Sequence, residues 1–496
     1  MDMSLQPWAI WCVALPLLAG MGSFMLGKRA GPRFGLAACP LIALATAALV
    51  VQLMEEGAKR YSLGGWGAPL GIEYQIDGFS ALMLVMTTVV GLFVSVYAWE
   101  YFRTGPGTTW RRAHKMRYFW PLWLFLWAAL HGLFLSADLF NIYVTLEIIG
   151  LTSVALIALA GAASLPAAMR YLFVSLAGSL FYLFGVMLLY SAYGELDLGL
   201  LARVVEPGPV AWVALGMMTV GMLLKTALFP LHFWLPPAHA NAPAPISAIL
   251  SGLVVKASFY VLARLWLGVF SDVVTLQFGQ LLGAFGAAAI VWGSVQALRQ
   301  KRLKMLVAYS TVAQLGYLFI IFPMAKVAPA LAWSSAAFFA ISHACAKGAL
   351  FMAAGTIARA LGHDELKKMG GIGKKLPITL FTIGLAGVSL MGLPPSGGYI
   401  AKWLILTAAT REESWFLVVV IHSGGLLAAA YIFRIVQCAF SRGDEVEKLD
   451  VPRALVWAPF GLAVVAIALG IASAYPLALL EIGNPFDVAL DVGVEP

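Results

Sequence analysis

Runs of apolar residues about as long as a bilayer is thick recur along the chain, separated by short polar stretches. A helix needs ~20 apolar residues to cross the hydrocarbon core. The pattern predicts about fourteen membrane-spanning helices, at 7–27, 34–54, 78–99, 118–135, 139–160, 171–193, 210–235, 245–267, 276–297, 305–324, 330–358, 376–410, 414–440 and 456–475. The twelfth run is too long for one straight helix, and its centre, MGLPPSGGY, predicts a broken one. The fold class is therefore an all-α polytopic membrane protein.

Composition supports this assignment. Of 496 residues, 61% are hydrophobic and 11% are charged, whereas a soluble domain carries roughly 25% charged residues. The net charge of +8 comes from basic residues in short loops, a pattern that topology explains better than nucleic-acid binding does. The four cysteines are isolated in apolar sequence and no GxxxxGK[ST] loop occurs. We therefore expect no metal or iron–sulfur cofactor, no nucleic-acid partner and no ATP-driven pump.

Charges in the loops predict the orientation. Basic residues cluster in four loops that all fall on one side of the membrane: Lys28, Arg29 and Arg33; Arg103, Arg111, Arg112, Lys115 and Arg117; Arg299, Lys301, Arg302 and Lys304; Lys367, Lys368, Lys374 and Lys375. The intervening loops and the tail are neutral or acidic, with Glu55, Glu56 and Asp77, then Glu195, Asp197 and Glu206, then Asp272, then Glu481, Asp487, Asp491 and Glu495. The positive-inside rule then places both termini outside the cytoplasm of a prokaryote, in its inner membrane. The first run lacks a basic start and a cleavage site, so we expect a retained span.

Ionisable residues inside the predicted spans are the strongest functional signal, because a charge at the bilayer centre is costly. Glu147 lies nine residues after Asp138, roughly 13 Å deep, and Lys225 lies near the middle of the seventh span. If the two helices touch, the carboxylate changes how readily the lysine holds its proton, and the pair forms a proton switch. The alternative is a structural ion pair that orients two helices.

Further candidates lie in the later spans. Lys256 is at mid-depth in the eighth span, His343 and Lys347 share one helix face at i and i+4, and Lys402 follows the break in the twelfth. Prolines after Pro230 predict a second broken helix, with His232 and His239 beside it as possible entry-path or capping residues. His422, Arg434 and Arg264 lie nearer helix ends, where long side chains reach water, and we expect them to be structural.

Several spaced motifs, ADLFNIYVTLEIIGL, KTALFPLHFWLP, SAILSGLVVKASFYVLAR, KRLKMLVAYSTVAQLGY, SHACAKGALF and DELKKMGG, resemble one family. It comprises the antiporter-type subunits shared by Mrp multisubunit sodium/proton antiporters, respiratory complex I and energy-converting hydrogenases. The resemblance implies inverted five-helix repeats around broken helices seven and twelve. The single transmembrane domain, 1–496, would then divide into N-terminal helices (7–117), a first repeat (118–267), a second repeat (276–440), and a last loop and C-terminal helix (441–496).

The resemblance also implies roles for the buried charges. Glu147 and Lys225 resemble the family's pair in spans five and seven, Lys256, His343 and Lys347 its central relay, and Lys402 its terminal group. Together they would form a proton path. The implied partners are other membrane subunits of a hetero-oligomeric complex, protons, sodium and lipids.

The branch of the family depends on a few positions. Lys402 resembles the D, L and N types, and the segment GGWGAPLGIEYQIDGFSALM looks most like that of the Mrp D type. The HANAPAP turn is more similar to the complex I and hydrogenase branches, although Pro237 stands where that branch commonly has aspartate. The leading hypothesis is Mrp-type sodium/proton antiport. The alternatives are a proton-pumping subunit of a redox complex and a non-transporting scaffold; in all three the chain has no catalytic centre of its own.

Overall fold

The computed structural model describes residues 8–104, 109–441 and 451–486, leaving aside the side chains of 109–112. The first half contains α1 (Trp8–Met25), α2 (Gly27–Glu56), α3 (Gly78–Arg103), α4 (Thr109–Leu135), α5 (Leu139–Ala158), α6 (Leu165–Tyr193), α7 (Leu198–Val204), α8 (Pro209–Thr226), α9 (Leu235–Asn241), α10 (Ala244–Ile249) and α11 (Val255–Arg264). A two-stranded antiparallel hairpin, β1 (Lys59–Ser62) and β2 (Glu73–Ile76), joins α2 to α3.

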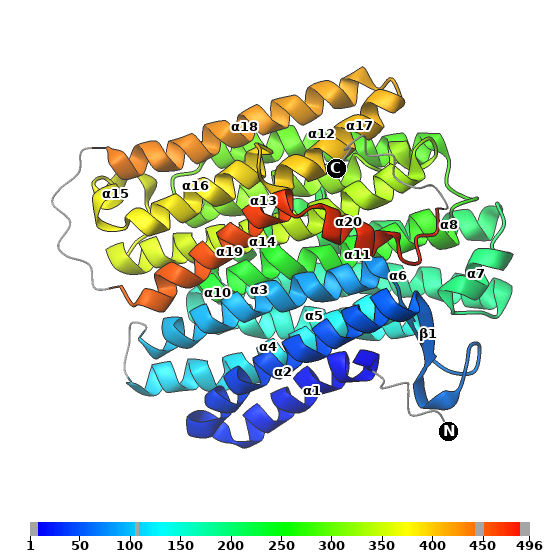
Figure 1. The fold of residues 1–496 in the computed structure, drawn as a ribbon, viewed down its shortest axis with the longest axis horizontal. Helices are drawn as coiled ribbons and strands as arrows, with labels where there is room; N and C mark the ends of the chain where they lie inside the picture. The colour runs from blue at the N-terminus through cyan, green and yellow to red at the C-terminus, as the bar shows by residue number, and fades with distance from the viewer. Residues whose placement is uncertain (1–7, 105–108, 442–450, 487–496) are drawn as a thin grey trace.

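The second half contains α12 (Leu276–Arg299), α13 (Leu303–Phe319), α14 (Pro329–Leu361), α15 (Ile372–Lys375), α16 (Pro377–Met391), α17 (Gly397–Arg411), α18 (Trp415–Phe440), α19 (Arg453–Ile471) and α20 (Ala474–Glu481). Within the described residues, thirteen helices are long and apolar enough to cross a membrane. The predicted twelfth span is the remaining one, divided into α16 and α17. The all-α polytopic fold is confirmed, and its long helices run side by side along the molecule (Figure 1).

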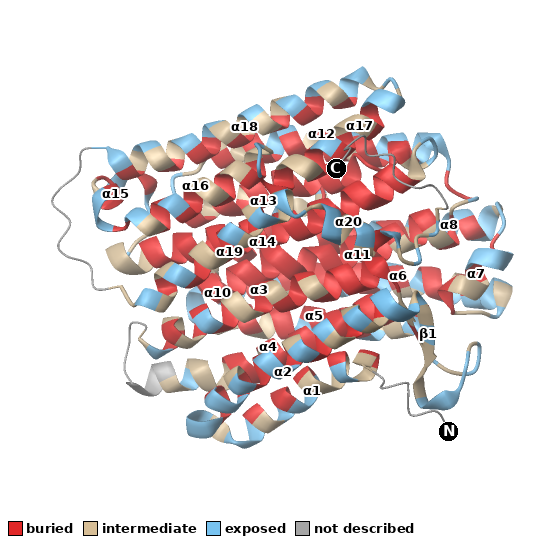
Figure 2. Cartoon of the chain, viewed as in Figure 1, coloured by how far each residue is buried: buried red, intermediate tan, exposed pale blue. Residues whose placement is uncertain are grey.

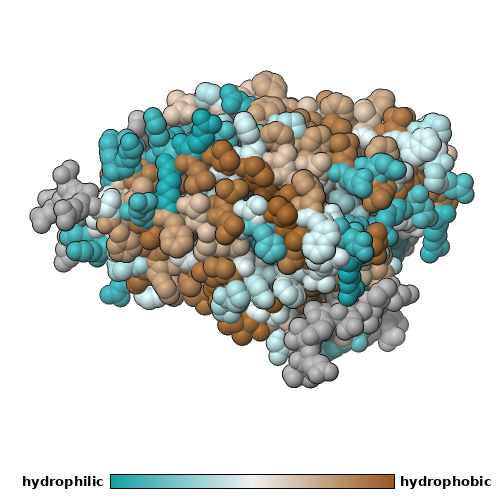
Figure 3. Space-filling view, turned by 90° about the horizontal axis from the view of Figure 1, so that it is seen from above, coloured by the Kyte–Doolittle hydropathy of each residue, from teal (hydrophilic) through white to brown (hydrophobic). Residues whose placement is uncertain are grey.

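Polar groups gather at the two ends of the helices, with apolar surface between them (Figure 3). At one end the predicted basic loops meet: Arg302 bonds to Asp364, Gly371 to Ser441, and Arg359 to Thr104. At the opposite end Arg60 bonds to Asp197, and the amide of Gly78 donates to Ile482. We call these the basic end and the acidic end. The side chains of Arg111 and Arg112, and residues Asp487, Asp491 and Glu495, lie outside the described residues.

Two helices are broken in the middle of the molecule. The first, α8, ends at Thr226 and is followed by Ala227 in the left-handed region (φ 60°). It ends four residues before Pro230 because a proline ring clashes with the carbonyl of residue i−4, here Thr226. The second break separates α16 from α17 and begins at Gly392, whose φ of 82° suits a residue without Cβ. Ser396 then caps α17 by accepting the amide of Tyr399.

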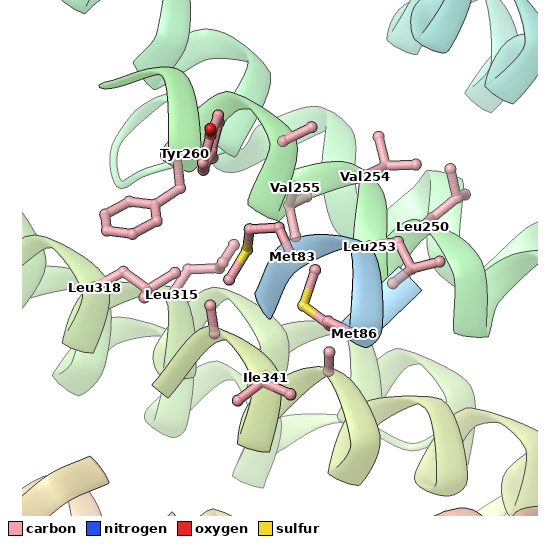
Figure 4. Packing of buried hydrophobic residues seen from close by; sticks show 14 of the residues in the cluster. Met83, Met86, Leu250, Leu253, Val254, Val255, Tyr260, Leu315, Leu318 and Ile341 are labelled. Atoms are coloured by element: carbon pink, nitrogen blue, oxygen red, sulfur yellow. The ribbon is translucent and has the colours of Figure 1, made fainter. Parts of the chain in front are cut away.

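The eighth predicted span is irregular as well. Between α10 and α11 lies a π-helical segment, Leu250–Val254, and a second one, Leu265–Val269, follows α11. Such segments hold one extra residue per turn and occur frequently at functional sites. The first packs in the apolar core beside Met83 and Met86 of α3 (Figure 4).

Burial is deepest along the central helices (Figure 2). Every residue of α14 from Ala330 to Ile357 is buried. The polar residues of this helix therefore lie inside protein and not against lipid. A helix that is buried all round is apolar on every face except where a polar residue has a function.

The expectation that Arg264 reaches water was wrong. Its guanidinium forms an ion pair with Asp77 at 2.6 Å and its side chain is 9% exposed. The rings of Phe79, Tyr260 and Trp333 surround the cation within 5.3 Å of its carbon. The cause is the capping box at the start of α3, which holds the carboxylate of Asp77 at this point.

Candidate functional site

The predicted pair of Glu147 and Lys225 meets in the structure. Glu147 on α5 and Lys225 on α8 approach to 3.8 Å between Oε1 and Nζ, and their side chains are 21% and 7% exposed. This distance is too long for a hydrogen bond, and Glu147 Oε1 is buried without a hydrogen-bond partner in the described structure. The two charges are therefore coupled electrostatically without a direct hydrogen bond.

Lys225 has a second partner that the sequence did not suggest. Its ammonium donates to Ser175 Oγ on α6 at 3.0 Å. A cavity of about 10 Å³ borders Lys225, Ser175 and Tyr171, close to the smallest space that holds one water molecule. Lys225 can therefore exchange a hydrogen bond between a neutral hydroxyl and a nearby carboxylate with a small movement.

Hydrogen bonds from other side chains stabilise the helix break after Lys225. Trp234 donates its indole N–H to the carbonyl of Leu224 in the last turn of α8, which also accepts the amide of Ala227. Thr226 donates to Ser258 on α11 at 3.0 Å, so the end of α8 is joined to the helix that carries Lys256. The broken helix thus links the first pair to the centre of the molecule.

At the centre lie two fully buried lysines. Lys256 on α11 donates to the carbonyl of Ser251 in the first π-helical segment. Lys347 on α14 donates to Ser310 Oγ at 2.5 Å and to the carbonyl of Val307, both on α13. Both side chains are 0% exposed. Neither has an acidic partner among the described residues, so only carbonyl and hydroxyl oxygens solvate these amines.

Two histidines lie between the lysines. His239 on α9 and His343 on α14 are buried, and neither ring nitrogen of either residue has a hydrogen-bond partner in the described structure. His239 interacts electrostatically with Lys256, Lys347 and Lys304, and His343 with Lys256, Lys347 and Lys402. An unpartnered imidazole can accept and pass on a proton at either nitrogen.

Lys402 lies at the second break. Its ammonium donates to the carbonyls of Leu390 and Met391, at 2.8 Å and 3.3 Å, where α16 ends. It also lies 4.2 Å from the centre of the Tyr317 ring. The free carbonyls at a helix C-terminus carry partial negative charge, and an aromatic face attracts a cation. Lys402 is thus solvated by a helix end and a ring, without a carboxylate.

The other two candidates differ in position. His239 belongs to the central group, whereas His232 is half-buried in the turn Leu231–Trp234, where its ring stacks on Phe229 at 5.5 Å. Lys304, which the sequence placed in a basic loop, is buried on α13 and donates to the carbonyl of Ala242 between α9 and α10. No signal in the sequence indicated this burial.

Within the described residues, no group of three or more His, Cys, Asp or Glu side chains is placed to hold a metal ion. The four cysteines are unpaired and lie far apart in the chain. What the structure does bring together is a row of amines and imidazoles from Lys225 through Lys256 and Lys347 to Lys402. Such a row can hold and move protons.

Comparison with known proteins gives two family matches. Residues 136–428 match the model described as NADH:quinone oxidoreductase/Mrp antiporter, TM. Residues 66–110 match the one described as NADH-Ubiquinone oxidoreductase (complex I), chain 5 N-terminus. The first match covers more than half of the chain and includes every candidate residue described above.

Individual relatives come from both branches of that family. The chain is 36% identical to the N-type subunit of the NADH-quinone oxidoreductase of Desulforudis audaxviator, over 88% of this chain and 86% of that protein. It is 30% identical to the D-type subunit of the Na(+)/H(+) antiporter of Alkalihalophilus pseudofirmus, over 79% and 78%. Among solved structures, a chain of the membrane-bound sulfane sulfur reductase, an archaeal respiratory membrane complex, matches with a TM-score of 0.87 and 27% identity, over 96% of both chains.

Proposed function

The chain belongs to the NADH:quinone oxidoreductase/Mrp antiporter transmembrane family, and from this premise we propose that it moves protons across a membrane as one subunit of a larger complex. The proton path runs through Glu147 and Lys225, then Lys256, His343 and Lys347, and ends at Lys402. The exchange of protons for sodium, as in an Mrp antiporter, is the leading form of this proposal.

The carrying observation is the row of buried amines, in which Lys256, Lys347 and Lys402 lack acidic partners among the described residues and Lys225 alone has one, Glu147. Two like charges in a medium of low dielectric repel strongly, and Lys256 and Lys347 interact in this way. A proton that arrives at one amine therefore disfavours the proton on the next. Protons would therefore pass from one amine to the next along the row. Moving Glu147 toward or away from Lys225 would start or stop this transfer.

We extend the proposal from the same premise to the location, orientation and partners of the protein. We assign it to the inner, cytoplasmic membrane of a prokaryote, with the basic end on the cytoplasmic side and both termini on the other side. The partners are other membrane subunits, since the relatives are named as subunits and the solved structure is a complex. Lipids cover the apolar belt between the ends (Figure 3).

The test is cation-dependent proton transport in inverted vesicles that carry the intact complex. Glu147→Ala and Lys225→Ala are expected to abolish transport while the complex still assembles. The exposed residues Glu206 and Lys301 supply matched controls, Glu206→Ala and Lys301→Ala, which should behave like the parent. Normal transport in both path variants would remove the switch, and a loss of assembly with intact transport per complex would favour a scaffold.

A redox-driven pump is the second candidate, and the 36% identity to a quinone oxidoreductase subunit favours it. In that case the complex would pump protons when a redox substrate is oxidised, and a sodium gradient would have no effect. Co-purified subunits with bound iron–sulfur clusters would support this form. A sodium gradient that drives proton movement in vesicles without any redox substrate would exclude it.

A further inference from the structure

A cavity of about 390 Å³ lies at the acidic end, between α12, the turn before α14 and the segment that joins α17 to α18. Most of its lining is apolar, including Leu276, Pro323 and Leu417. Three polar side chains face it: Gln280 on α12, and Glu412 and Ser414 in the connecting segment. None of the path residues proposed above lines this cavity.

Glu412 is the unusual group. Its Oε1 atom is buried and has no hydrogen-bond partner in the described part of the chain, and burial raises the pKa of its carboxyl above the ordinary value. The next residue, Glu413, is exposed. A raised pKa lets a carboxyl hold its proton nearer neutral pH and release it on a modest change. Glu412 therefore has the properties of a proton-exchange group, and Glu413 does not.

The charged groups around Glu412 do not neutralise it. Arg411 and Glu413 flank it in sequence, and α12 presents the neutral Gln280. Lys326, beside the lining residue Val327, donates to the carbonyl of Ser271 at 2.5 Å. No ion pair within the described residues joins Glu412 to any of them. The carboxyl of Glu412 is therefore not neutralised by a neighbouring charge where it borders the cavity.

The cavity is connected to Lys402 in two ways. Glu412 follows the same half-helix, α17, on which Lys402 lies. In addition, the Tyr317 ring against the Lys402 ammonium carries a hydroxyl that donates to the carbonyl of Ile421 on α18 at 3.1 Å. Leu417, which lines the cavity, is one helical turn from Ile421. The ring that contacts the last amine of the path is therefore hydrogen-bonded to α18, the helix that contributes Leu417 to the cavity wall.

We propose that the cavity with Glu412 is the proton-exchange site between Lys402 and the water at the acidic end. The proposal rests on the proposed function and extends its path by one group. The Lys402 ammonium becomes a neutral amine as it gives its proton to intervening water, which carries the proton into the cavity. The Glu412 carboxylate takes up that proton, becomes a carboxylic acid, and returns to the carboxylate when the proton leaves to water.

The experiment measures proton transport by the intact complex in inverted vesicles, whose lumen corresponds to the acidic end. Luminal pH is varied at fixed external pH, and then the reverse. Glu412→Gln is expected to lower transport about tenfold and to remove its dependence on luminal pH, while the dependence on external pH stays. Glu412→Asp should keep a shifted luminal profile, and Glu413→Gln is the matched control that should leave both profiles unchanged.

Each outcome decides something. Parent-like transport and an unchanged luminal profile in Glu412→Gln overturn this inference alone; a parent complex that moves no protons overturns the proposed function as well. If Glu412→Gln does not assemble, Glu412→Asp decides, since an unshifted luminal profile there rejects the site.

Discussion

The lysines beside the two helix breaks have different kinds of partner. In α8 the lysine precedes the break, and Lys225 has a carboxylate on α5 at 3.8 Å and a hydroxyl on α6 as partners. In α17 the lysine follows the break, and Lys402 is bound by the carbonyls that the break itself exposes. The first amine therefore depends on neighbouring helices, whereas the second depends on the end of its own broken helix.

This difference separates two ways of keeping an amine inside a membrane protein. A carboxylate can move and change the charge balance, so the first break is suited to switching. A helix end has a fixed partial charge that holds a cation without a counter-ion, so the second break is suited to receiving and passing on a proton. Neither arrangement fully compensates the charge, which fits groups that gain and lose protons.

The largest expected effect is on proton transport. The two broken helices should differ in how much the loss of the lysine lowers the stability of the protein. Lys225→Met and Lys402→Met should each lower proton transport about 100-fold. Lys225→Met should also cost about 3 kcal/mol of unfolding free energy, because it leaves Glu147 without its partner. Lys402→Met should cost less, since Gln314 still donates to the carbonyl of Leu390. Thermal unfolding of the purified complex checks this, and equal losses would contradict the distinction.

The second prediction concerns the residues at the breaks. Gly392→Ala is expected to destabilise the protein by about 1–2 kcal/mol, because an L-residue is strained at its positive φ. The added Cβ would also lie 2.6 Å from Cδ of Lys402, so transport should fall too. Ala227 already has φ 60°, and Ala227→Gly should therefore be neutral or stabilising. A thermal shift assay on both variants is the measurement, and a stabilised Gly392→Ala would be the contrary result.

The smallest predicted effect separates the partners of Lys225. Ser175→Ala removes its hydroxyl partner and should slow transport about fivefold, the worth of one hydrogen bond, by leaving the ammonium nearer Glu147. Ser179 is one turn further on the same helix and buried without a partner among the described residues. Ser179→Ala is thus a matched control that should transport like the parent. Initial rates in vesicles measure both, and equal rates would show that Ser175 has no part in the exchange.

Much of the fold follows from the sequence because a bilayer restricts what an apolar run can form. The break before Lys402 followed from two prolines and three glycines. The equal depth of Glu147 and Lys225 allowed them to meet, but only the structure shows that α5 and α8 bring them together. The end of α8 was placed too late because a proline acts on the carbonyl four residues before it. The π-helical segments beside Lys256 left no pattern in the apolar run at all.

The residues that sequence reasoning missed share one cause. Ser175 is one of many serines in apolar helices, Lys304 follows other basic residues of a loop, and Glu412 lies in a short polar connection beside Glu413. Nothing in composition or spacing distinguishes them from groups that face lipid or water. Only tertiary contacts separate them: a bond to Lys225, a bond to Ala242, and a cavity.

The π-helical segment Leu250–Val254 also fixes a rotational phase. In a regular helix each residue turns the chain by about 100°, and a π-turn accommodates one residue more than an α-turn. The direction in which Lys256 points, measured from the start of α10 at Ala244, therefore depends on the π-turn. If the same residues formed a regular α-helix, the amine would point about 100° away and face a different neighbour, so the π-turn is as much a part of the path as the lysine.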